Sequence, residues 1–272
     1  CLALAREWKN RGAEVFFICL SQPGDMCENL QKMGFPVIRL HYGPVFDEHD
    51  DREATTAALR EQPVDWVVVD HYSVTAEWER KIRPCGKKLM VIDDLAREHD
   101  CDVLLDPNFA ENPELRYKGK VPAGCTVLLG PRYALLRPEF ADAARRSMQS
   151  SPRSDGVRRL LVFFGGSDPT NETVKTLQAL DDPAFRHLWV DVVVGAANPH
   201  RDEIEERCRK LGNARFYCQI DFIHELMVRA DLSVGAGGTA TWERMICGLP
   251  SLIIAVADNQ VPGAKALERA GA

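Results

Sequence analysis

Short runs of apolar residues recur along the whole chain, and polar or mixed segments long enough for a helix separate them. Strands that alternate with helices in this way are typical of βαβ units, so the pattern predicts an α/β protein. The apolar interiors of the runs indicate parallel strands that are covered on both faces. The predicted strands are residues 15–19, 37–40, 66–70, 89–93, 103–106, 127–129, 160–164, 189–194, 215–218, 232–234 and 252–256.

The strands fall into two series, and a polar segment separates them. Residues 147–156 contain four serines, a proline and a final glycine, which favour a loop and interrupt the periodic pattern. We therefore predict two Rossmann-like domains, at residues 1–146 and 157–272. Each is long enough to bury a core of its own.

Both ends of the chain fall inside predicted elements. Residues 1–8 already have the pattern of an amphipathic helix, with Leu4 and Trp8 on one face. Residues 266–270 form a helix that no strand follows. We therefore expect a fragment that is truncated at its N-terminus and also at its C-terminus, with a first strand and its βα turn ahead of Cys1.

Ligands of open α/β sheets bind beyond the carboxyl ends of the strands, so the residues that follow the strands are the candidates for a site. One such turn reads Gly165, Gly166, Ser167 and Asp168. The glycines permit a close backbone approach, and an aspartate followed by Pro169 resembles the start of a helix that stabilises an anion. A tight turn with a capped helix and no ligand is an equal alternative.

A second turn gives a stronger signal, because three glycines lead from a strand directly into the helix predicted at residues 240–247. They are Gly235, Gly237 and Gly238. Their backbone N–H groups can converge at the start of the helix, where they would bind phosphate oxygens.

Polar side chains extend this second candidate site. The hydroxyl groups of Thr239 and Thr241 add donors, and Glu243 can accept hydrogen bonds from both hydroxyls of a ribose. A glutamate there is alternatively a simple complement of the helix dipole, worth about 0.3–1 kcal/mol. After the next strand, Asn259 and Gln260 suit the hydroxyl or amide groups of a sugar, although such residues more commonly cap a solvated loop.

The first half has its own polar residues after the strands. His71 and Tyr72 follow one strand and are candidates for binding a substrate, and a histidine can also act as an acid or base. A structural hydrogen bond is the more common role of such a histidine. A carboxylate-rich metal site is conceivable but disfavoured, because its members alternate around strands. Those members are Asp93, Asp94, His99, Asp100, Asp102 and Asp106.

Composition narrows the class of function. The net charge is -6 with both signs interspersed, which disfavours a nucleic-acid partner or a polybasic membrane anchor. The apolar stretch at residues 252–257 is far shorter than the roughly 20 residues that span a bilayer. The nine cysteines show no CxxC spacing and favour a reduced, cytoplasmic compartment. We therefore expect small-molecule chemistry, with no membrane insertion and no metal.

Several motifs, taken together and in order, resemble one known family. The motifs lie at residues 69–72, 91–96, 101–106, 129–140, 164–168, 235–244 and 258–260. They are similar to those of the UDP-sugar hydrolases of pseudaminic acid biosynthesis. The resemblance covers nearly the whole chain, which makes it more specific than any single glycine turn.

The resemblance implies the glycosyltransferase-B-like fold and a reaction. Water would attack the anomeric carbon of UDP-2,4-diacetamido-2,4,6-trideoxy-β-L-altropyranose and release UDP, with no cofactor. The second domain would hold the diphosphate at Gly237, Gly238 and Thr239 and the ribose at Glu243. The first domain would act on the sugar, with Tyr72 near the reacting centre.

The same resemblance places further residues. The turn at residues 165–168 would line the site, and Asn259 and Gln260 would lie beside the sugar. The family's general base is a histidine in a GxGHxxR turn, which we expect ahead of Cys1, so a chain that starts at Cys1 would lack it. His71 matches a family histidine to which we assign no role as base.

Two other functions stay open. A glycosyltransferase of the same fold needs an acceptor site, often with an apolar, membrane-facing patch, and no such patch is evident in the first half. A binder of nucleotide sugars without activity would need no base. The sequence does not predict an oligomeric state.

Overall fold

The computed structural model describes residues 1–22, 25–43, 45–149 and 156–271. The chain forms two compact units, Cys1–Leu135 (unit 1) and Leu136–Ala272 (unit 2). All eleven predicted strands are present, and their ends differ from the predicted ends by at most 3 residues. Apolar runs locate buried strands well because only a strand with both faces covered tolerates so little polar surface.

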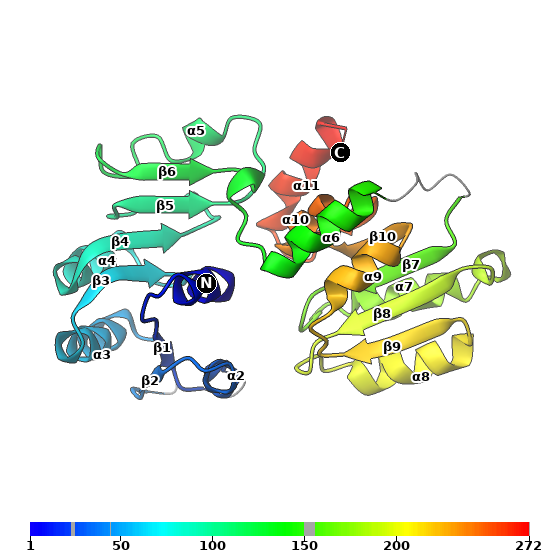
Figure 1. Cartoon of the computed structure of the whole chain (residues 1–272), viewed down its shortest axis with the longest axis horizontal. Coiled ribbons are helices and arrows are strands. Elements are labelled where there is room, and N and C mark those ends of the chain that lie inside the picture. Colours follow the sequence, from blue (N-terminus) through cyan, green and yellow to red (C-terminus); the bar gives the residue numbers. More distant parts are fainter. Residues whose placement is uncertain (23–24, 44, 150–155, 272) are drawn as a thin grey trace. The chain divides into compact units, whose positions relative to one another are not determined.

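Unit 1 contains two parallel sheets. Strands β1 and β2 form one sheet, and the other has the order β3-β4-β5-β6, whose strands lie side by side in Figure 1. The elements are α1 (Leu2–Asn10), β1 (Phe17–Leu20), α2 (Cys27–Lys32), β2 (Val37–Leu40), α3 (Glu48–Glu61), β3 (Val64–Val69), α4 (Ala76–Ile82), β4 (Gly86–Ile92), β5 (Val103–Asp106), α5 (Pro113–Arg116) and β6 (Thr126–Leu129), with 3-10 helices at Arg83–Cys85 and Pro131–Tyr133.

The core of unit 1 lies between the larger sheet and helices α3 and α4. Trp78 and Ile82 of α4 pack with Leu89 of β4 and Leu104 of β5, and all four side chains are buried. Each such side chain stabilises the fold by about 1.5–3 kcal/mol. This packing fixes the carboxyl ends of β3 and β4, which carry the candidate residues of this unit.

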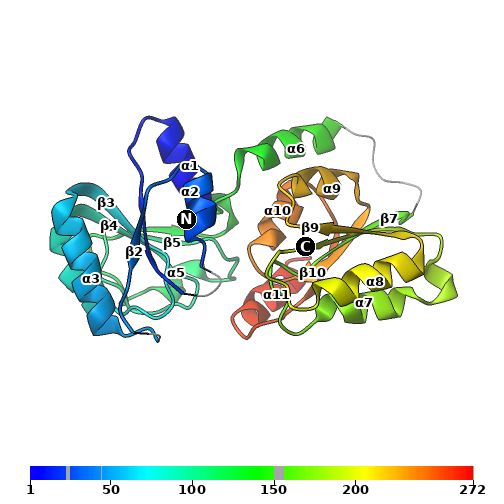
Figure 2. The same cartoon turned by 90° about the horizontal axis from the view of Figure 1, so that it is seen from below.

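Unit 2 is built on one five-stranded parallel sheet of order β11-β10-β7-β8-β9. Helices α7 and α8 lie on one side of this sheet and α9 on the other, as Figure 2 shows. The elements are α6 (Pro138–Gln149), β7 (Arg159–Phe163), α7 (Glu172–Leu180), β8 (Trp189–Val194), α8 (Arg201–Leu211), β9 (Ala214–Cys218), α9 (Ile223–Arg229), β10 (Leu232–Ala236), α10 (Ala240–Ile246), β11 (Ser251–Ile254) and α11 (Gln260–Arg269), with a 3-10 helix at Pro183–Phe185.

The two faces of this sheet receive alternate residues of its central strands. Leu160 and Val162 of β7 pack toward α7 and α8, whereas Leu161 packs toward α6 and α9. Because successive side chains of a strand point to opposite faces, a run of apolar residues fills both layers. The sheet is therefore held rigidly from both sides, and its carboxyl edge is a stable platform for loops.

The boundary between the units differs from the predicted one. The prediction ended the first domain at residue 146, but α6 packs against α9 and α10 of unit 2. Phe140 and Ala143 of α6 are completely buried in that core. The amphipathic helix therefore belongs to the second unit. Of the predicted linker, residues 147–149 are the end of α6, and residues 150–155 lie outside the described residues.

Across the described ranges, no helix has both the length and the apolar character that crossing a membrane requires.

Candidate functional site

The carboxyl edge of the unit 2 sheet brings glycine backbones into very close contact. A Cβ atom on Gly235 would lie 2.3 Å from the carbonyl oxygen of Phe163, and one on Gly195 would lie 2.4 Å from that of Gly166. No larger residue fits at either place without moving the backbone. Gly195 was not among the predicted site residues, although its position directly after β8 is a signal that could have identified it.

The glycine loop at residues 237–239 follows β10 and is braced by a side chain of α11. The Oε1 atom of Gln260 accepts hydrogen bonds from the N–H groups of Gly237, at 3.1 Å, and Val256, at 3.0 Å. Gln260 thus ties the loop to the chain that follows β11. Asn259 precedes it as the N-cap residue of α11, and its side chain is half-buried.

A buried arginine supports the same loop from the inside. Arg244 is 1% exposed, and its Nη2 donates to the carbonyl of Ala236 at 2.7 Å and to Oγ1 of Thr241 at 3.2 Å. Thr241 was predicted to bind the ligand, but its side chain is buried and its hydroxyl accepts from Arg244. Thr239, in contrast, is exposed at the start of α10. Burial lowers the pKa of Arg244 to about 10, although Glu243 opposes the shift.

Glu243 lies beside two arginines. Its side chain is half-buried, and this burial raises the pKa of the carboxyl group, whereas the positive charges of Arg137 and Arg244 lower it. Arg137 directly precedes α6 and donates to the carbonyl of Asp221 at 2.9 Å. Sequence analysis did not select Arg137, because its approach to Glu243 depends on where α6 packs.

The turn after β7 is a helix cap with an exposed tip. Both carboxylate oxygens of Asp168 accept backbone N–H groups, from Glu172 and Thr173, each at 2.9 Å. The helix begins at Glu172 and not at the predicted Pro169. The side chain of Asp168 therefore caps the helix across the turn that lies between them. Asp168 is 1% exposed, whereas Gly166 and Ser167 are exposed. The exposed pair is the part of this turn that a ligand can reach.

In unit 1, His71 and Tyr72 are exposed directly after β3. The Nδ1 atom of His71 accepts from the N–H of Ser73 at 3.1 Å, and its ring packs 4.8 Å from that of Phe46. Tyr72 is 62% exposed. Partial burial and the carboxylate of Asp94, which interacts with its hydroxyl, raise the pKa of Tyr72 to about 12. Tyr72 therefore presents a protonated hydroxyl at neutral pH.

Four of the five carboxylates that the sequence allowed as a metal site pair with cationic side chains instead. Asp93 contacts Arg97 and His99, and Asp106 contacts Arg116. The other members that pair in this way are Asp100 with Arg80 and Arg83, and Asp102 with Arg83 and Lys88. The negative charges of these four aspartates are neutralised locally, which disfavours their binding a shared ion.

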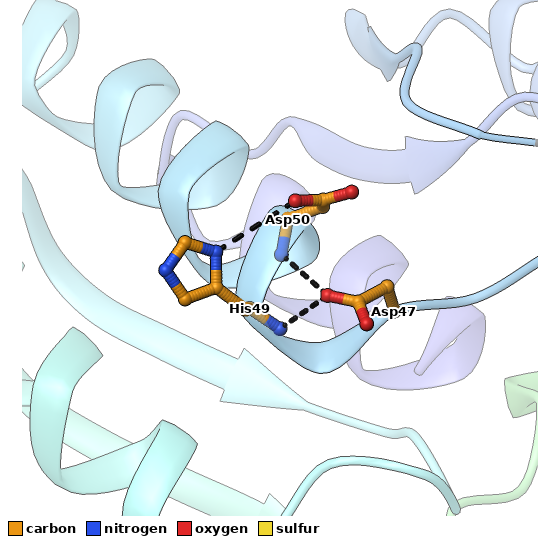
Figure 3. A group of neighbouring side chains, drawn as sticks. All are labelled: Asp47, His49 and Asp50. Carbon is orange, nitrogen blue, oxygen red and sulfur yellow. Dashed lines mark hydrogen bonds and ion pairs between the residues drawn. The ribbon is translucent and has the colours of Figure 1, made fainter.

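One group of possible metal ligands occurs among the described residues, at the start of α3 (Figure 3). It consists of Asp47, His49 and Asp50, all exposed. The Oδ1 atom of Asp47 accepts the N–H groups of His49 and Asp50, at 2.9 and 3.0 Å. This arrangement is an ordinary N-cap of a helix and needs no ion.

Comparison with known sequences gives distant relatives. No family model matches the chain. It is similar to the UDP-2,4-diacetamido-2,4,6-trideoxy-β-L-altropyranose hydrolase of Campylobacter jejuni, with 22% identity over 272 residues, 99% of this chain and 90% of the relative. It is also 25% identical over 258 residues to an uncharacterised protein of Methanocaldococcus jannaschii, covering 93% of this chain and 51% of that protein.

A third relative is the spore coat polysaccharide biosynthesis protein SpsG of Bacillus subtilis. The identity is 30% over 160 residues, 58% of this chain and 46% of that protein. The chain thus spans about half the length of the archaeal and Bacillus relatives and most of the Campylobacter hydrolase.

Solved structures establish the fold. The chain superposes on MurG of Acinetobacter baumannii with a TM-score of 0.64 and 16% identity, covering 100% of this chain and 80% of that one. MnaA of S. aureus, solved with UDP, gives a TM-score of 0.60 and 11% identity, covering 97% and 78%. The predicted fold is confirmed as glycosyltransferase-B-like, with two Rossmann-like units, and the resemblance is confirmed in that this chain is a distant relative of the Campylobacter hydrolase.

Proposed function

We propose that this protein acts on a UDP-sugar and, more specifically, hydrolyses a UDP-linked diacetamido-trideoxy sugar to the free sugar and UDP. In this reaction water attacks the anomeric carbon and the bond between that carbon and the diphosphate oxygen breaks. The similarity to the Campylobacter hydrolase extends over 99% of the chain, which supports this reaction class. Pseudaminic acid biosynthesis is the corresponding pathway.

The braced glycine loop of unit 2 is the observation that carries the proposal. Gly237, Gly238 and Thr239 would bind the diphosphate, because Gln260 and Arg244 fix the loop while the side chain of Thr239 stays exposed. The N–H of Gly237 already donates to Gln260, so the N–H groups of Gly238 and Thr239 would be the fixed donors that stabilise the charge growing on the leaving UDP.

The other candidate residues divide between the two ends of the substrate. Glu243 would accept hydrogen bonds from the ribose, and Gly166 with Ser167 would line the same side of unit 2. In unit 2, Asn259 and the Nε2 atom of Gln260 would contact the sugar. In unit 1, His71 and Tyr72 would be the residues that bind the substrate. Thr241 and Asp168 would act indirectly, since both are buried and hold the loops in place.

A glycosyltransferase is the second candidate. The chain is 30% identical over 161 residues, 57% of its length and 42% of the relative, to the N-acetylglucosamine transferase that acts on pyrophosphoryl-undecaprenol N-acetylmuramyl-(pentapeptide) in Salinibacter ruber. A transferase would release UDP only when an acceptor is present. A non-catalytic binder would hold the UDP-sugar and never release UDP.

The first experiment measures UDP release from the diacetamido-trideoxy UDP-sugar in the presence of EDTA. Residues 1–272 are assayed with and without an added undecaprenyl-linked acceptor. Release without an acceptor supports the hydrolase. Release that requires added undecaprenyl-linked acceptor supports the transferase, and binding without any release supports the binder.

A second experiment tests the nucleotide site by itself. Glu243→Gln removes the carboxylate charge at the expected ribose position, and we expect UDP affinity to fall about tenfold, the effect of one charged hydrogen bond. Glu225→Gln on α9 is the matched control, because that glutamate pairs with the exposed Arg229. Equal UDP affinity in both variants would contradict the assignment of Glu243.

A further inference from the structure

Three buried ionisable residues form a contiguous group in unit 1. The Nδ1 atom of His99 lies 2.7 Å from Oε1 of Glu79, and its Nε2 lies 3.2 Å from Oδ2 of Asp93 in an ion pair. The exposed fractions of Glu79, Asp93 and His99 are 0%, 1% and 4%. The second oxygen of Glu79 accepts the N–H of Asp100 at 2.7 Å. A protonated His99 between the two carboxylates balances half of their charge.

Arg97 connects this group to the loop that carries His71 and Tyr72. Its Nε donates to Oδ1 of Asp93 at 2.9 Å. On the other side, its guanidinium donates to three backbone carbonyls, those of His71 at 3.2 Å, Tyr72 at 2.7 Å and Val74 at 2.9 Å. The four residues Glu79, Asp93, Arg97 and His99 are called the Arg97 network below.

The backbone of Asp93 and Asp94 is held by two further side chains, those of Tyr117 and Arg116. The hydroxyl of Tyr117 donates to the backbone carbonyl of Asp93 at 2.9 Å, and Arg116 donates to the carbonyl of Asp94 at 2.8 Å. Asp94 in turn interacts with the hydroxyl of Tyr72. Both the backbone and the hydroxyl of Tyr72 therefore depend on residues 93–97.

This arrangement exceeds what stability needs. Burying an ion pair is about neutral compared with apolar packing, so such a pair is weak evidence for stability alone. Here the arginine of the pair, Arg97, also donates to three backbone carbonyls of one exposed loop. A planar guanidinium with several fixed donors can hold such a loop in one geometry. The residue at its centre, Tyr72, is 62% exposed, so burial of its own side chain contributes little to holding the loop.

We propose that Arg97, itself oriented by Asp93, His99 and Glu79, is a positioning residue that fixes the loop at residues 71–74 and thereby aims Tyr72 at the substrate. This inference rests on the proposed function, since it needs Tyr72 to meet the sugar. It gives a role to Asp93, the buried carboxylate of the motif at residues 91–96.

Substitution of Arg97 tests the proposal by kinetics and by double mutation. We expect Arg97→Met to lower kcat for UDP release about 100-fold, as misplacement of a reacting group does, while KM changes little. Arg97→Lys, which keeps the charge beside Asp93, should not restore kcat, because an ammonium cannot reach the carboxylate and three carbonyls together. In a Tyr72→Phe background, Arg97→Met should cost little more, because both changes remove the same function.

The matched control is Arg80→Met. Arg80 also pairs with an aspartate, Asp100 at 3.2 Å, but it is 61% exposed and touches no carbonyl of the loop. We expect this variant to keep the parent kcat. Additive losses in the Arg97 and Tyr72 double variant, or rescue by lysine, would overturn the proposal.

Amide hydrogen exchange decides the proposal independently of activity. Exchange across residues 71–75 should accelerate at least tenfold in Arg97→Met and stay unchanged in Arg80→Met, with UDP binding equal in both. Unchanged exchange of this segment in Arg97→Met would overturn the proposal. If the parent protein releases no UDP at all, the proposed function fails, and the exchange result still decides whether Arg97 orders the loop.

Discussion

In unit 1 the loop after β3 is held by a network of charged side chains. In unit 2 the loop after β10 is held by close backbone packing and by hydrogen bonds to the neutral Gln260 and from Arg244. Arg97 reaches three carbonyls of the first loop and is balanced by Asp93. The second loop depends on Gly235 and on Gln260, and the Nε and Nη1 atoms of Arg244 have no hydrogen-bond partner among the described residues.

This difference predicts how each loop responds to pH and to changes in side-chain volume. A charged brace depends on protonation state, because every partner must keep its charge. A steric brace depends on volume and is indifferent to pH. The predictions below use this contrast, in order of expected effect.

The largest effect should follow from removing the central cation of unit 1. His99→Gln leaves Glu79 and Asp93 buried without a positive charge between them, and losing one partner of a buried pair costs about 3–5 kcal/mol. Chemical denaturation of unit 1, followed through Trp78 in its core, measures this loss. His187→Gln is the control, because His187 is exposed and contacts only a backbone carbonyl. Equal free energies of unfolding for the two variants would contradict a stabilising role of the charge network.

Alkaline pH should weaken unit 1 through the same residue. Burial alone would lower the pKa of His99, but hydrogen bonds and the charges of Asp93 and Glu79 raise it to about 9, well above its ordinary 6.5. A raised pKa means that the stabilisation is complete below pH 6.5 and is lost as the pH rises through 9. The total is on the order of 3 kcal/mol.

The measurement is the free energy of unfolding of unit 1 between pH 6 and 10, with His187→Gln as a reference that keeps His99. Asp93 reinforces the expectation: its own burial opposes ionisation, yet His99 and Arg97 hold its pKa well below the usual range. A flat profile over this window would show that His99 is neutral in the folded protein.

A steric change should act on unit 2 with little dependence on pH. In Gly235→Ala the new Cβ would overlap the carbonyl oxygen of Phe163, and overpacking of this kind costs about 1–3 kcal/mol. Thermal unfolding measures the cost. Gly263→Ala is the matched control, since this helical glycine of α11 has open space, and alanine there should stabilise by about 0.5–1 kcal/mol.

The smallest effect should come from the amide brace of the glycine loop. Gln260→Ala removes the acceptor of two backbone N–H groups and should lower stability by about 1 kcal/mol while weakening UDP binding. Gln260→Glu keeps the acceptor and should retain stability. Isothermal titration with UDP and a denaturation curve separate the two outcomes, and unchanged UDP affinity in the alanine variant would contradict the bracing role.

The pattern of the sequence was sufficient for the elements and for the places where loops follow strands. Apolar runs located all eleven strands, because burial of both faces leaves a continuous apolar stretch that is visible locally. The glycine loop at residues 237–239 was also visible, since glycine is the residue that allows close backbone approach. The roles of its residues in binding stay predictions.

Tertiary structure decided which way the side chains face. Asp168 and Thr241 looked like ligand contacts, but packing turned both inward as supports. Sequence analysis assigned helix α6 to the first domain, but its apolar face packs against α9 of unit 2. Such outcomes depend on which surface a segment finds in the folded chain.

The Arg97 network shows the same division most plainly. Glu79 and His99 are 20 residues apart, and each by itself is an ordinary polar residue of a helix or a loop. Local sequence cannot show that they meet, because their contact depends on how α4 packs beside β4. The sequence by itself determined where strands, glycine loops and candidate polar residues lie, and the tertiary structure decided which of those polar residues are exposed and which are buried and hold the others in place.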